Sequence, residues 1–329
     1  MMANILNDKP ILVTGAAGFI GFHLAKALLD KGCTVVGLDN LNAYYSPELK
    51  DARLSLLSEY PNFTFKKIEL NSLSELQALF DTYKFDVVVH LAAQAGVRYS
   101  IDAPMTYCDS NLVGMMHILE CCRHNAIKHL LFASSSSVYG LSDTMPLTET
   151  AKTDSPVSLY AATKKANEAM AYSYAKLYGL PMTGLRFFTV YGPWGRPDMA
   201  LFKFVEKMRN HQSIDVYNMG QMRRDFTYID DVINAIVSMI PNVPDQKVPY
   251  EIFNIGSNNP KQLLDFIEEI ERALGVKADK NLLPMQAGDV LDTWADVQKL
   301  KKHGHPLPNT PFADGIKAFV DWHLAYYAT

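Results

Sequence analysis

Tyr160 and Lys164 form a Tyr-x-x-x-Lys pattern, in which the lysine follows the tyrosine by four positions. On a helix, positions i and i+4 share one face, so the Lys164 ammonium would lie beside the Tyr160 phenol. A neighbouring positive charge favours the phenolate, which lowers the pKa of the tyrosine and allows it to act as a base on a hydroxyl group. The same spacing also occurs by chance on solvated helices, so the surrounding residues must decide between the two interpretations.

Ser135 supplies part of that context, because it follows the apolar run Leu130–Ser134, which is typical of a buried strand. In a parallel sheet the ligand cleft lies at the carboxyl ends of the strands. We therefore expect Ser135 to share a cleft with Tyr160, where its hydroxyl would bond the same substrate oxygen and relay its proton.

A glycine pattern, Gly15-x-x-Gly18-x-x-Gly21, lies between the apolar run Ile11–Thr14 and the helical pattern Phe19–Lys31. The first glycine permits a tight turn, the second lets the backbone approach a diphosphate, and the third lets the helix pack closely on the strand. The helix N-terminus adds free N–H groups and a positive dipole end. The pattern indicates a dinucleotide site, although a tight strand–helix turn without a ligand gives the same spacing.

Asp39 indicates which dinucleotide is bound. It follows the second apolar run, Thr34–Leu38, at a place where a carboxylate can accept hydrogen bonds from the adenosine ribose hydroxyls. Its charge would repel a 2′-phosphate, and none of the four residues after it is an arginine. We therefore predict NAD as the cofactor in preference to NADP.

Strand-like and helical patterns alternate up to about residue 188, which predicts an α/β fold with a doubly wound parallel sheet. Helical patterns between the strands include Ser74–Tyr83 and Tyr107–Asn125. The predicted strands are Ile11–Thr14, Thr34–Leu38, Phe63–Lys66, Val87–His90, Leu130–Ser134 and Met182–Phe187.

Beyond residue 188 the loops are rich in Gly, Pro and Met, which favours a smaller substrate-binding domain. Asp230–Ile240 and Ile252–Ile255 nevertheless read as one more helix and strand of the main sheet, so this C-terminal domain is predicted to be discontinuous. We expect residues 1–188 plus about 226–256 to form the cofactor domain, and residues 189–225 plus about 257–329 to form the substrate domain.

Composition excludes several classes of function. The net charge of −4 offers no broad basic surface for nucleic acid. No apolar run approaches the ~18 residues needed to cross a bilayer, and the N-terminus has no signal-peptide pattern. The four cysteines and nine histidines show no metal-ligand spacing, so no metal is expected. Adjacent Cys121 and Cys122 are typical of reduced thiols, which predicts a cytoplasmic protein.

Six elements together resemble the extended short-chain dehydrogenase/reductase family, and in particular its sugar-nucleotide epimerases. The resemblance runs from about Pro10 to Trp322 and implies a Rossmann-type fold. The elements are the glycine pattern, Asp39, His90–Ala93, Asn111, Ser134–Gly140 and the pair Tyr160 and Lys164.

The resemblance implies a role for each catalytic residue. Tyr160 would be the base, Lys164 would orient the nicotinamide ribose and lower the pKa of Tyr160, and Ser135 would assist. Hydride would leave sugar C4, giving a 4-keto intermediate, and would return to its other face.

The resemblance also implies the contacts to NAD, with one departure. Many relatives have an Asp near the position of Glu69, which meets the adenine amino group. Here main-chain groups around Leu70 would make that contact instead. The implied NAD contacts are Gly15, Gly18, Phe19, Ile20, Gly21, Asp39, Asn40, Leu70, Leu91, Ala92, Ala93, Asn111, Tyr160 and Lys164.

Departures from related branches narrow the reaction. The 4,6-dehydratases of this family carry Asp-Glu where Ser136 and Ser137 stand, and UDP-glucuronate decarboxylases carry Glu in place of Ser137. UDP-glucose 4-epimerases commonly have Asn in place of Thr189 and Arg in place of Gln286. Residues 95–100, 185–200 and 285–290 instead resemble UDP-glucuronate 4-epimerases, which implies epimerisation of UDP-glucuronate to UDP-galacturonate.

A carboxylated sugar suits the residues expected around it. Ser136, Ser137 and Thr189 offer hydroxyl donors without adding negative charge. The resemblance places Arg224 on the diphosphate and Tyr217 against uracil, and an arginine fork suits phosphate oxygens. The remaining substrate contacts that we expect are Arg196 to phosphate or carboxylate, Arg98, and Asp289 to the uridine ribose.

Other readings of the chain stay open at this point. UDP-glucose or a UDP-N-acetylhexosamine is the alternative substrate for the same reaction. A non-catalytic NAD-binding sensor on the same fold is a more remote alternative. Related proteins pair the helices around Tyr107–Asn125 and Tyr160–Leu177 in a dimer, so a homodimer is expected here.

Overall fold

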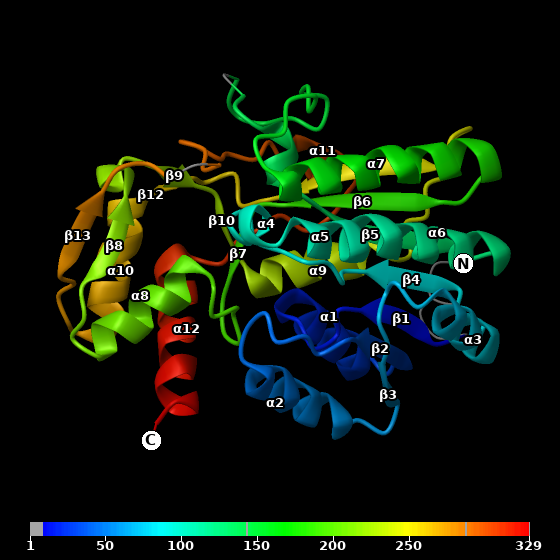
Figure 1. The fold of residues 1–329 in the computed structure, drawn as a ribbon, viewed down its shortest axis with the longest axis horizontal. Coiled ribbons are helices and arrows are strands. Elements are labelled where there is room, and N and C mark those ends of the chain that lie inside the picture. The colour runs from blue at the N-terminus through cyan, green and yellow to red at the C-terminus, as the bar shows by residue number, and fades with distance from the viewer. Residues whose placement is uncertain (1–8, 143, 287, 329) are drawn as a thin grey trace.

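A computed structural model describes residues 9–142, 144–286 and 288–328 (Figure 1). Residues 1–8 lie outside this part, and they belong to the N-terminal region in which no signal peptide is expected. Residue 287, within the 285–290 segment, also lies outside it. At the centre is a seven-stranded sheet in the order β11-β6-β5-β4-β1-β2-β3, with every neighbouring pair parallel. The predicted doubly wound α/β fold is confirmed.

The strands of this sheet begin and end within one residue of the six predicted runs. The expected additional strand is also present and pairs with β6 at the sheet edge. The strands are β1 (Ile11–Thr14), β2 (Val35–Asp39), β3 (Phe63–Lys67), β4 (Val87–His90), β5 (His129–Ser135), β6 (Met182–Phe187) and β11 (Tyr250–Ile255).

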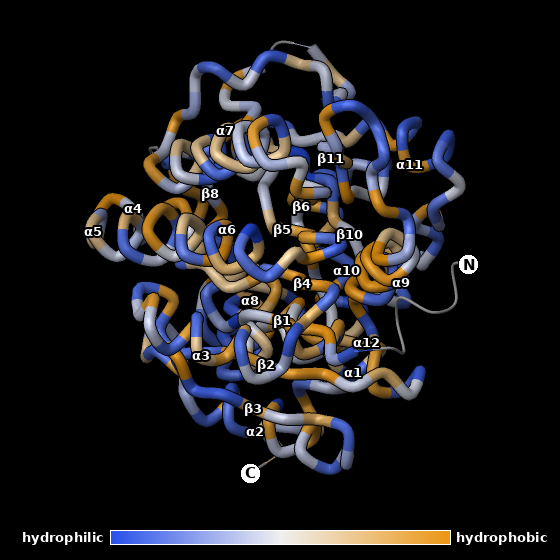
Figure 2. The backbone as a smooth tube through the Cα atoms, turned by 90° about the vertical axis from the view of Figure 1, so that its right-hand side faces the viewer, coloured by the Kyte–Doolittle hydropathy of each residue, from blue (hydrophilic) through white to orange (hydrophobic). Residues whose placement is uncertain are grey.

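Helices cover both faces of the sheet because alternate residues of each strand point to opposite sides. Ile11 and Val13 of β1 face a core formed with α1, α2 and α9, whereas Leu12 faces a core formed with α3, α6 and α7. Figure 2 shows that hydrophobic residues gather in this interior. The bounds are α1 (Phe19–Asp30), α2 (Pro47–Ser58), α3 (Leu73–Tyr83), α6 (Gly114–His124), α7 (Leu159–Tyr178) and α9 (Ile229–Met239).

The glycine pattern brings α1 against the end of β1. A Cβ on Gly21 would lie 2.0 Å from the carbonyl oxygen of Gly15, so no larger residue fits there. Gly15 itself has φ +74°, a conformation that side chains disfavour. Gly18 caps the helix without a side-chain hydrogen bond, which leaves the first N–H groups of α1 free for a ligand.

The predicted helix Tyr107–Asn125 is interrupted in the structure. Helix α5 (Pro104–Tyr107) runs into a π-helical segment, η1 (Cys108–Val113), before α6 begins. Buried Asn111 lies in this π-helical segment, where its amide bonds the backbone of Gln94. Periodicity alone did not reveal the change, because a short π-helical segment within a longer helical stretch leaves most of the i, i+3, i+4 apolar pattern in place.

A second group of elements lies beside the sheet, at the left of Figure 1, and has a hydrophobic core of its own. It contains three two-stranded sheets, β7–β10, β8–β13 and β9–β12. The bounds are β7 (Thr189–Tyr191), α8 (Ala200–Arg209), β8 (Ile214–Tyr217), η3 (Asn218–Gly220), β9 (Arg223–Arg224), β10 (Phe226–Tyr228), β12 (Lys261–Gln262), α10 (Leu263–Leu274), β13 (Lys280–Leu283) and α12 (Phe312–Tyr326).

We propose to divide the chain as its sequence suggested, into residues 1–188 plus about 226–256 and residues 189–225 plus about 257–329. The separate core of the second group and the placement of α9 and β11 on the main sheet support this division, with the boundary nearer to Ile229 because Phe226 of β10 packs in the second core. Helix α11 (Gln298–Lys302) packs against β11, so the boundary is crossed again near the C-terminus. Among the described residues, no helix is both long and apolar enough to cross a membrane.

Candidate active site

A cleft of about 480 Å³ opens at the carboxyl ends of the central strands, where the sheet topology leads us to expect a ligand. It brings together most of the residues singled out from the sequence. Those that line it are Gly15, Gly18, Phe19, Ile20, Gly21, Asp39, Asn40, Leu70, Leu91, Ala92, Ala93, Ser135, Ser136, Ser137, Tyr160, Lys164, Thr189, Arg196 and Asp289.

Four predicted residues do not line the cleft: Asn111, Arg98, Tyr217 and Arg224. Asn111 instead joins the loop after β4 to α7, because its amide nitrogen donates to Gln94 O and Thr163 Oγ1, both at 3.0 Å. In this geometry Asn111 holds the loop after β4 against α7, and its expected contact with NAD stays a prediction.

The cofactor end of the cleft fits NAD. The Asp39 carboxylate accepts one backbone N–H at each oxygen, from Ala17 at 3.2 Å and from Leu41 at 2.9 Å. Its remaining lone pairs are available for a ribose diol. Asn40 donates to Glu69, whose carboxylate also lines this end of the cleft. The negative charges here suit a ribose with free hydroxyls better than one that carries a 2′-phosphate.

Lys164 is held in place by β5, the strand that ends at the cleft with Ser135. Its ammonium donates to the carbonyl oxygen of Ala133 on β5 at 2.9 Å. Burial lowers the pKa of Lys164 from 10.5 to about 8. One of its three protons is thus committed to the backbone, and the others remain for a ligand in the cleft.

Tyr160 lies in the first turn of α7, which begins after Ser158 caps the helix by accepting the Ala161 N–H. Burial raises the pKa of Tyr160, while a hydrogen bond with Ser135 and the charge of Arg196 lower it. Lys164 was expected to provide this lowering, but its ammonium donates to the Ala133 carbonyl and is not among the groups that shift this pKa here. In this geometry the local groups that favour the phenolate are therefore Ser135 and Arg196.

Ser135 ends β5 and caps the short 3₁₀-helix η2 (Ser136–Tyr139). Its hydroxyl accepts the Ser137 N–H and donates to Ser137 Oγ, both at 3.1 Å. The cap holds three consecutive serines at the mouth of β5, next to Tyr160. The site consequently carries hydroxyl donors and no carboxylate at positions 136 and 137.

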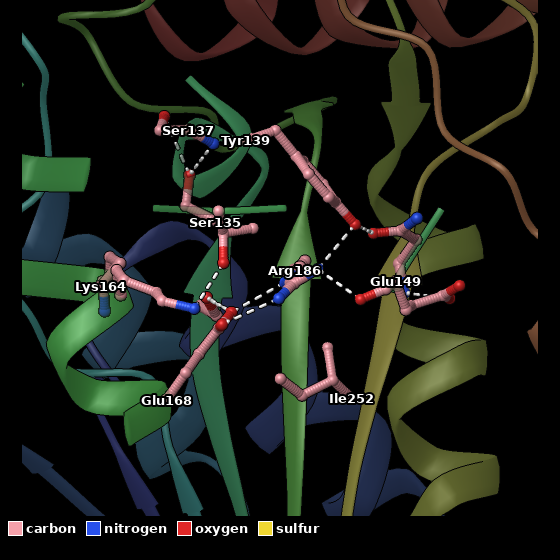
Figure 3. Close-up of polar contacts among 12 residues, drawn as sticks. Ser135, Ser137, Tyr139, Glu149, Lys164, Glu168, Arg186 and Ile252 are labelled. Carbon is pink, nitrogen blue, oxygen red and sulfur yellow. Dashed lines mark hydrogen bonds and ion pairs between the residues drawn. The ribbon is translucent and has the colours of Figure 1, made fainter. Parts of the chain in front are cut away.

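A buried ion pair between Glu168 and Arg186 lies next to Ser135, below it in the view of Figure 3. Glu168 of α7 accepts from Arg186 of β6 at both carboxylate oxygens, each at 2.8 Å, and also from the Ser134 hydroxyl at 2.6 Å. Both charged side chains are only 4% exposed. Because Glu168 follows Lys164 by one helical turn, the pair anchors the catalytic end of α7 to the sheet.

The same arginine also reaches the far side of the serine turn. Arg186 donates to the Tyr139 hydroxyl at 2.9 Å and to the carbonyl oxygen of Glu149 at 3.1 Å. Tyr139 in turn donates to Asn254 of β11 at 2.6 Å. Since Tyr139 ends η2, this network holds both ends of the segment that presents Ser135.

Arg196 faces the sugar end of the cleft from the loop between β7 and α8. Its Nε donates to Asp198 Oδ1 at 2.9 Å, and Nη2 donates to the other oxygen of the same carboxylate. Although burial alone would raise it, the charge of Arg196 holds the pKa of Asp198 below its ordinary value. The guanidinium edge formed by Nη1 and Nη2 retains donors for an anionic group.

Three of the residues expected near the nucleotide, Arg98, Tyr217 and Arg224, lie just outside the cleft lining, next to Asp289, which is part of it. Arg98 forms an ion pair with Asp289 at 3.3 Å and lies over the ring of Tyr217, 5.0 Å from its centroid. Arg224 donates to the carbonyl oxygens of Val290 at 2.6 Å and Leu291 at 2.9 Å. Arg98 therefore covers one face of the ring proposed for uracil, and Arg224 stabilises the loop that carries Asp289.

Comparison with known proteins supports this geometry. The model of the NAD dependent epimerase/dehydratase family matches residues 11–256. The chain belongs to this family. It is 52% identical to Protein CapI of Staphylococcus aureus, over 96% of this chain and 99% of that one. It is 44% identical to UDP-glucuronate 4-epimerase 4 of Arabidopsis thaliana, over 98% of this chain and 77% of the relative.

A solved structure is also similar. The UDP-glucuronic acid 4-epimerase from Bacillus cereus, in complex with UDP-glucuronic acid and NAD, superposes with a TM-score of 0.91 at 34% identity. The match covers 97% of this chain and 100% of that one. The family resemblance and the NAD cofactor expected from the sequence are thereby confirmed.

Sequence reasoning missed the residues that support this epimerase-family site from behind. Glu168 was identifiable in principle, since it occupies the i+4 position after Lys164 in the same helical pattern. Arg186 lies in an apolar strand, where a charged residue needs a buried partner. Asp198 follows Arg196 by two positions, but nothing in the pattern shows that the two side chains pair.

We predict that Glu168→Gln destabilises the fold by about 3–5 kcal/mol, because it leaves the buried Arg186 charge without a counter-ion. Urea unfolding followed by circular dichroism measures the change. Asp321→Asn, which removes the exposed partner of Lys317, is the matched control and should cost about 1 kcal/mol or less. Equal losses in the two variants would contradict the anchoring role of the buried pair.

Proposed function

We propose that this chain catalyses the NAD-dependent 4-epimerisation of UDP-glucuronate to UDP-galacturonate. The observation that carries the proposal is the set of neutral hydroxyl donors, Ser136, Ser137 and Thr189, in the same cleft as Tyr160 and Lys164. The named activities of the Arabidopsis and Bacillus relatives support the same substrate.

The catalytic residues act on a proton at the sugar C4 hydroxyl. Tyr160 removes this proton when C4 is oxidised and returns it when the 4-keto sugar is reduced from its other face. Ser135 bonds the same oxygen and stabilises the phenolate of Tyr160. Lys164 uses its remaining protons to orient the bound nucleotide. When bound, NAD supplies the hydride acceptor and donor.

The serines explain how a carboxylated sugar survives the reaction. The 4-keto uronate is a β-keto acid. It loses CO₂ when the bond from the ring to the carboxylate carbon is aligned with the π-system of the C4 carbonyl. Donors at Ser136, Ser137 and Thr189 hold the carboxylate in the plane of the ring, which disfavours that loss. The short helix capped by Ser135 fixes two of these donors in one turn.

Each alternative function would leave some of the residues in the cleft without a role. UDP-glucose or a UDP-N-acetylhexosamine carries no carboxylate, so the serine turn would face a neutral sugar substituent. Dehydration receives no support, because positions 136 and 137 offer no carboxyl group to remove a proton or water. A non-catalytic NAD-binding sensor would not require Ser135, Tyr160 and Lys164 together in the cleft.

We also propose a cytoplasmic homodimer. All four cysteines are unpaired, which is typical of a reducing compartment. Apolar side chains are exposed along α4 (Tyr99–Asp102), α5, η1, α6 and α7, an arrangement that a second copy would bury. These side chains are Ile101, Met105, Val113, Met116, Tyr172 and Leu177.

The substrate assignment predicts that purified protein converts UDP-glucuronate to UDP-galacturonate and turns over UDP-glucose and UDP-N-acetylglucosamine far more slowly. Anion-exchange separation of the products measures this. Tyr160→Phe should fold normally and lose most turnover, by roughly a hundredfold or more, because the base is absent. Turnover of UDP-glucose alone would overturn the substrate and leave the reaction type intact.

The same separation tests the serine turn. Ser136→Ala combined with Ser137→Ala should raise the proportion of UDP-pentose among the products, because the carboxylate is no longer held in the ring plane. An unchanged product ratio and unchanged substrate binding would exclude this role for the two serines.

The pH dependence of turnover should change in Ser135→Ala. The hydrogen bond with Ser135 lowers the pKa of Tyr160, and the base acts only when it is deprotonated. Its removal therefore raises this pKa and moves the acidic limb of the kcat profile to higher pH. Ser213→Ala, at an exposed serine, should leave the limb in place. A limb that stays still or moves to lower pH in Ser135→Ala would contradict the assignment.

Sedimentation velocity tests the dimer. The protein should sediment at about twice its chain mass, and Met116→Asp should shift it toward the monomer because a charge enters the apolar face. Leu282→Asp, at an exposed leucine of β13, is the control and should leave the dimer intact. A monomeric wild-type protein would rule the dimer out.

A further inference from the structure

Residues 193–198, called here the Arg196 segment, connect β7 to α8 and carry Arg196 into the cleft. Trp194 in this segment has φ +60°, a strained conformation for a bulky residue. Such strain persists only where the surroundings hold the backbone firmly. The contacts that hold it come largely from the cofactor-binding side of the molecule.

Two of these contacts flank the centre of the segment. His23 of α1 donates to the carbonyl oxygen of Pro193 at 2.9 Å. Burial lowers the pKa of His23 to about 4, so this is a bond from a neutral imidazole. At the other end, the Tyr44 hydroxyl donates to Asp198 at 3.1 Å. Tyr44 follows Asp39 in the loop between β2 and α2.

Arg53 of α2 makes the central contact. Its Nη2 donates to the carbonyl oxygens of Trp194 at 2.6 Å and Gly195 at 3.4 Å. Its Nη1 donates to the carbonyl oxygen of Ala17 at 2.7 Å, inside the glycine turn, and to the Tyr45 hydroxyl at 2.8 Å. One planar group therefore joins the cofactor turn to the Arg196 segment.

No carboxylate in the described part of the chain pairs with the charge of Arg53. The side chain is fully buried, and within the described residues it forms no ion pair, while its Nε has no hydrogen-bond partner. A buried cation held only by carbonyl and hydroxyl dipoles is costly. The neighbouring N-terminus of α1 is the seat for a doubly charged diphosphate, which would offset this cost on binding.

We propose that Arg53 is a positioning residue that couples the NAD seat to the sugar site. It holds the glycine turn and the Arg196 segment in one fixed relation, so that each site is fully formed only when the other is. The coupling to the sugar rests on the function proposed above, whereas the coupling to NAD rests on the fold alone. A lysine cannot replace Arg53, because a single ammonium cannot span both carbonyl groups.

The first test uses variants of the holoenzyme. Arg53→Lys should raise both the Kd for NAD and the KM for UDP-glucuronate by roughly tenfold, while kcat falls less. Arg272→Lys, at an exposed arginine of α10, is the matched control and should change either value by less than about twofold. Unchanged NAD affinity in Arg53→Lys would overturn the proposal.

A double variant separates coupling from general damage. Arg196→Met alone should raise KM, and the same change in an Arg53→Lys background should add much less, because the segment is already misplaced. Fully additive effects on kcat/KM would show that the two residues act independently, against the proposal.

A measurement on the unaltered protein removes dependence on how the variants fold. Adding NAD alone should slow hydrogen exchange of the backbone amides in the Arg196 segment, as resolved by mass spectrometry. Exchange in residues 280–283 of β13, far from the cofactor turn, serves as the control. The result does not depend on which sugar is the substrate. No change in the Arg196 segment on NAD binding would contradict the coupling.

Discussion

The buried ion pair between Glu168 and Arg186 is the interaction on which the catalytic geometry depends. It joins α7 to β6 and, through Ser134, to β5. Lys164 lies one helical turn before Glu168, so the pair fixes the helix that also carries Tyr160. A buried pair of this kind contributes little net stability compared with apolar packing, but its removal is costly because one charge remains. Its value here lies in the fixed placement of three catalytic side chains.

Burial sets the protonation chemistry around that anchor. It raises the pKa of Tyr160 and lowers that of Lys164 to about 8, which opposes the ionised form of each group. Ser135 and Arg196 act in the other direction on the tyrosine. Ionisation of Tyr160 therefore depends on Ser135 and Arg196. The Glu168–Arg186 ion pair fixes the first of these residues, and the Arg196 segment carries the second.

The sequence predicted those parts of the molecule that follow from local pattern. Strand positions, the glycine turn and the convergence of Ser135 with Tyr160 and Lys164 depend on periodicity and on the topology of parallel sheets. The π-helical break at Asn111 could not be predicted, because it preserves the apolar pattern on both sides. The ring of Tyr217 proved to be covered by Arg98, a contact between segments far apart in the chain.

The residues that support the site were the hardest to foresee. Arg53, Glu168 and Arg186 act through partners 8 to 142 positions away, as the contacts of Arg53 with Tyr45 and with Gly195 show. A single sequence shows that a charged residue occurs within a helix or strand, but it does not show which distant group will meet it. Only the packed structure supplies that information.

A crystal structure of this chain with NAD and UDP-glucuronate tests the central claim most directly. We expect the Tyr160 hydroxyl within hydrogen-bond distance of the sugar C4 oxygen, with Lys164 on the nicotinamide ribose while it still donates to Ala133. We also expect the Glu168–Arg186 pair to be unchanged behind them. A tyrosine turned away from C4, with the ion pair intact, would show that the anchor does not deliver the base to the reacting atom.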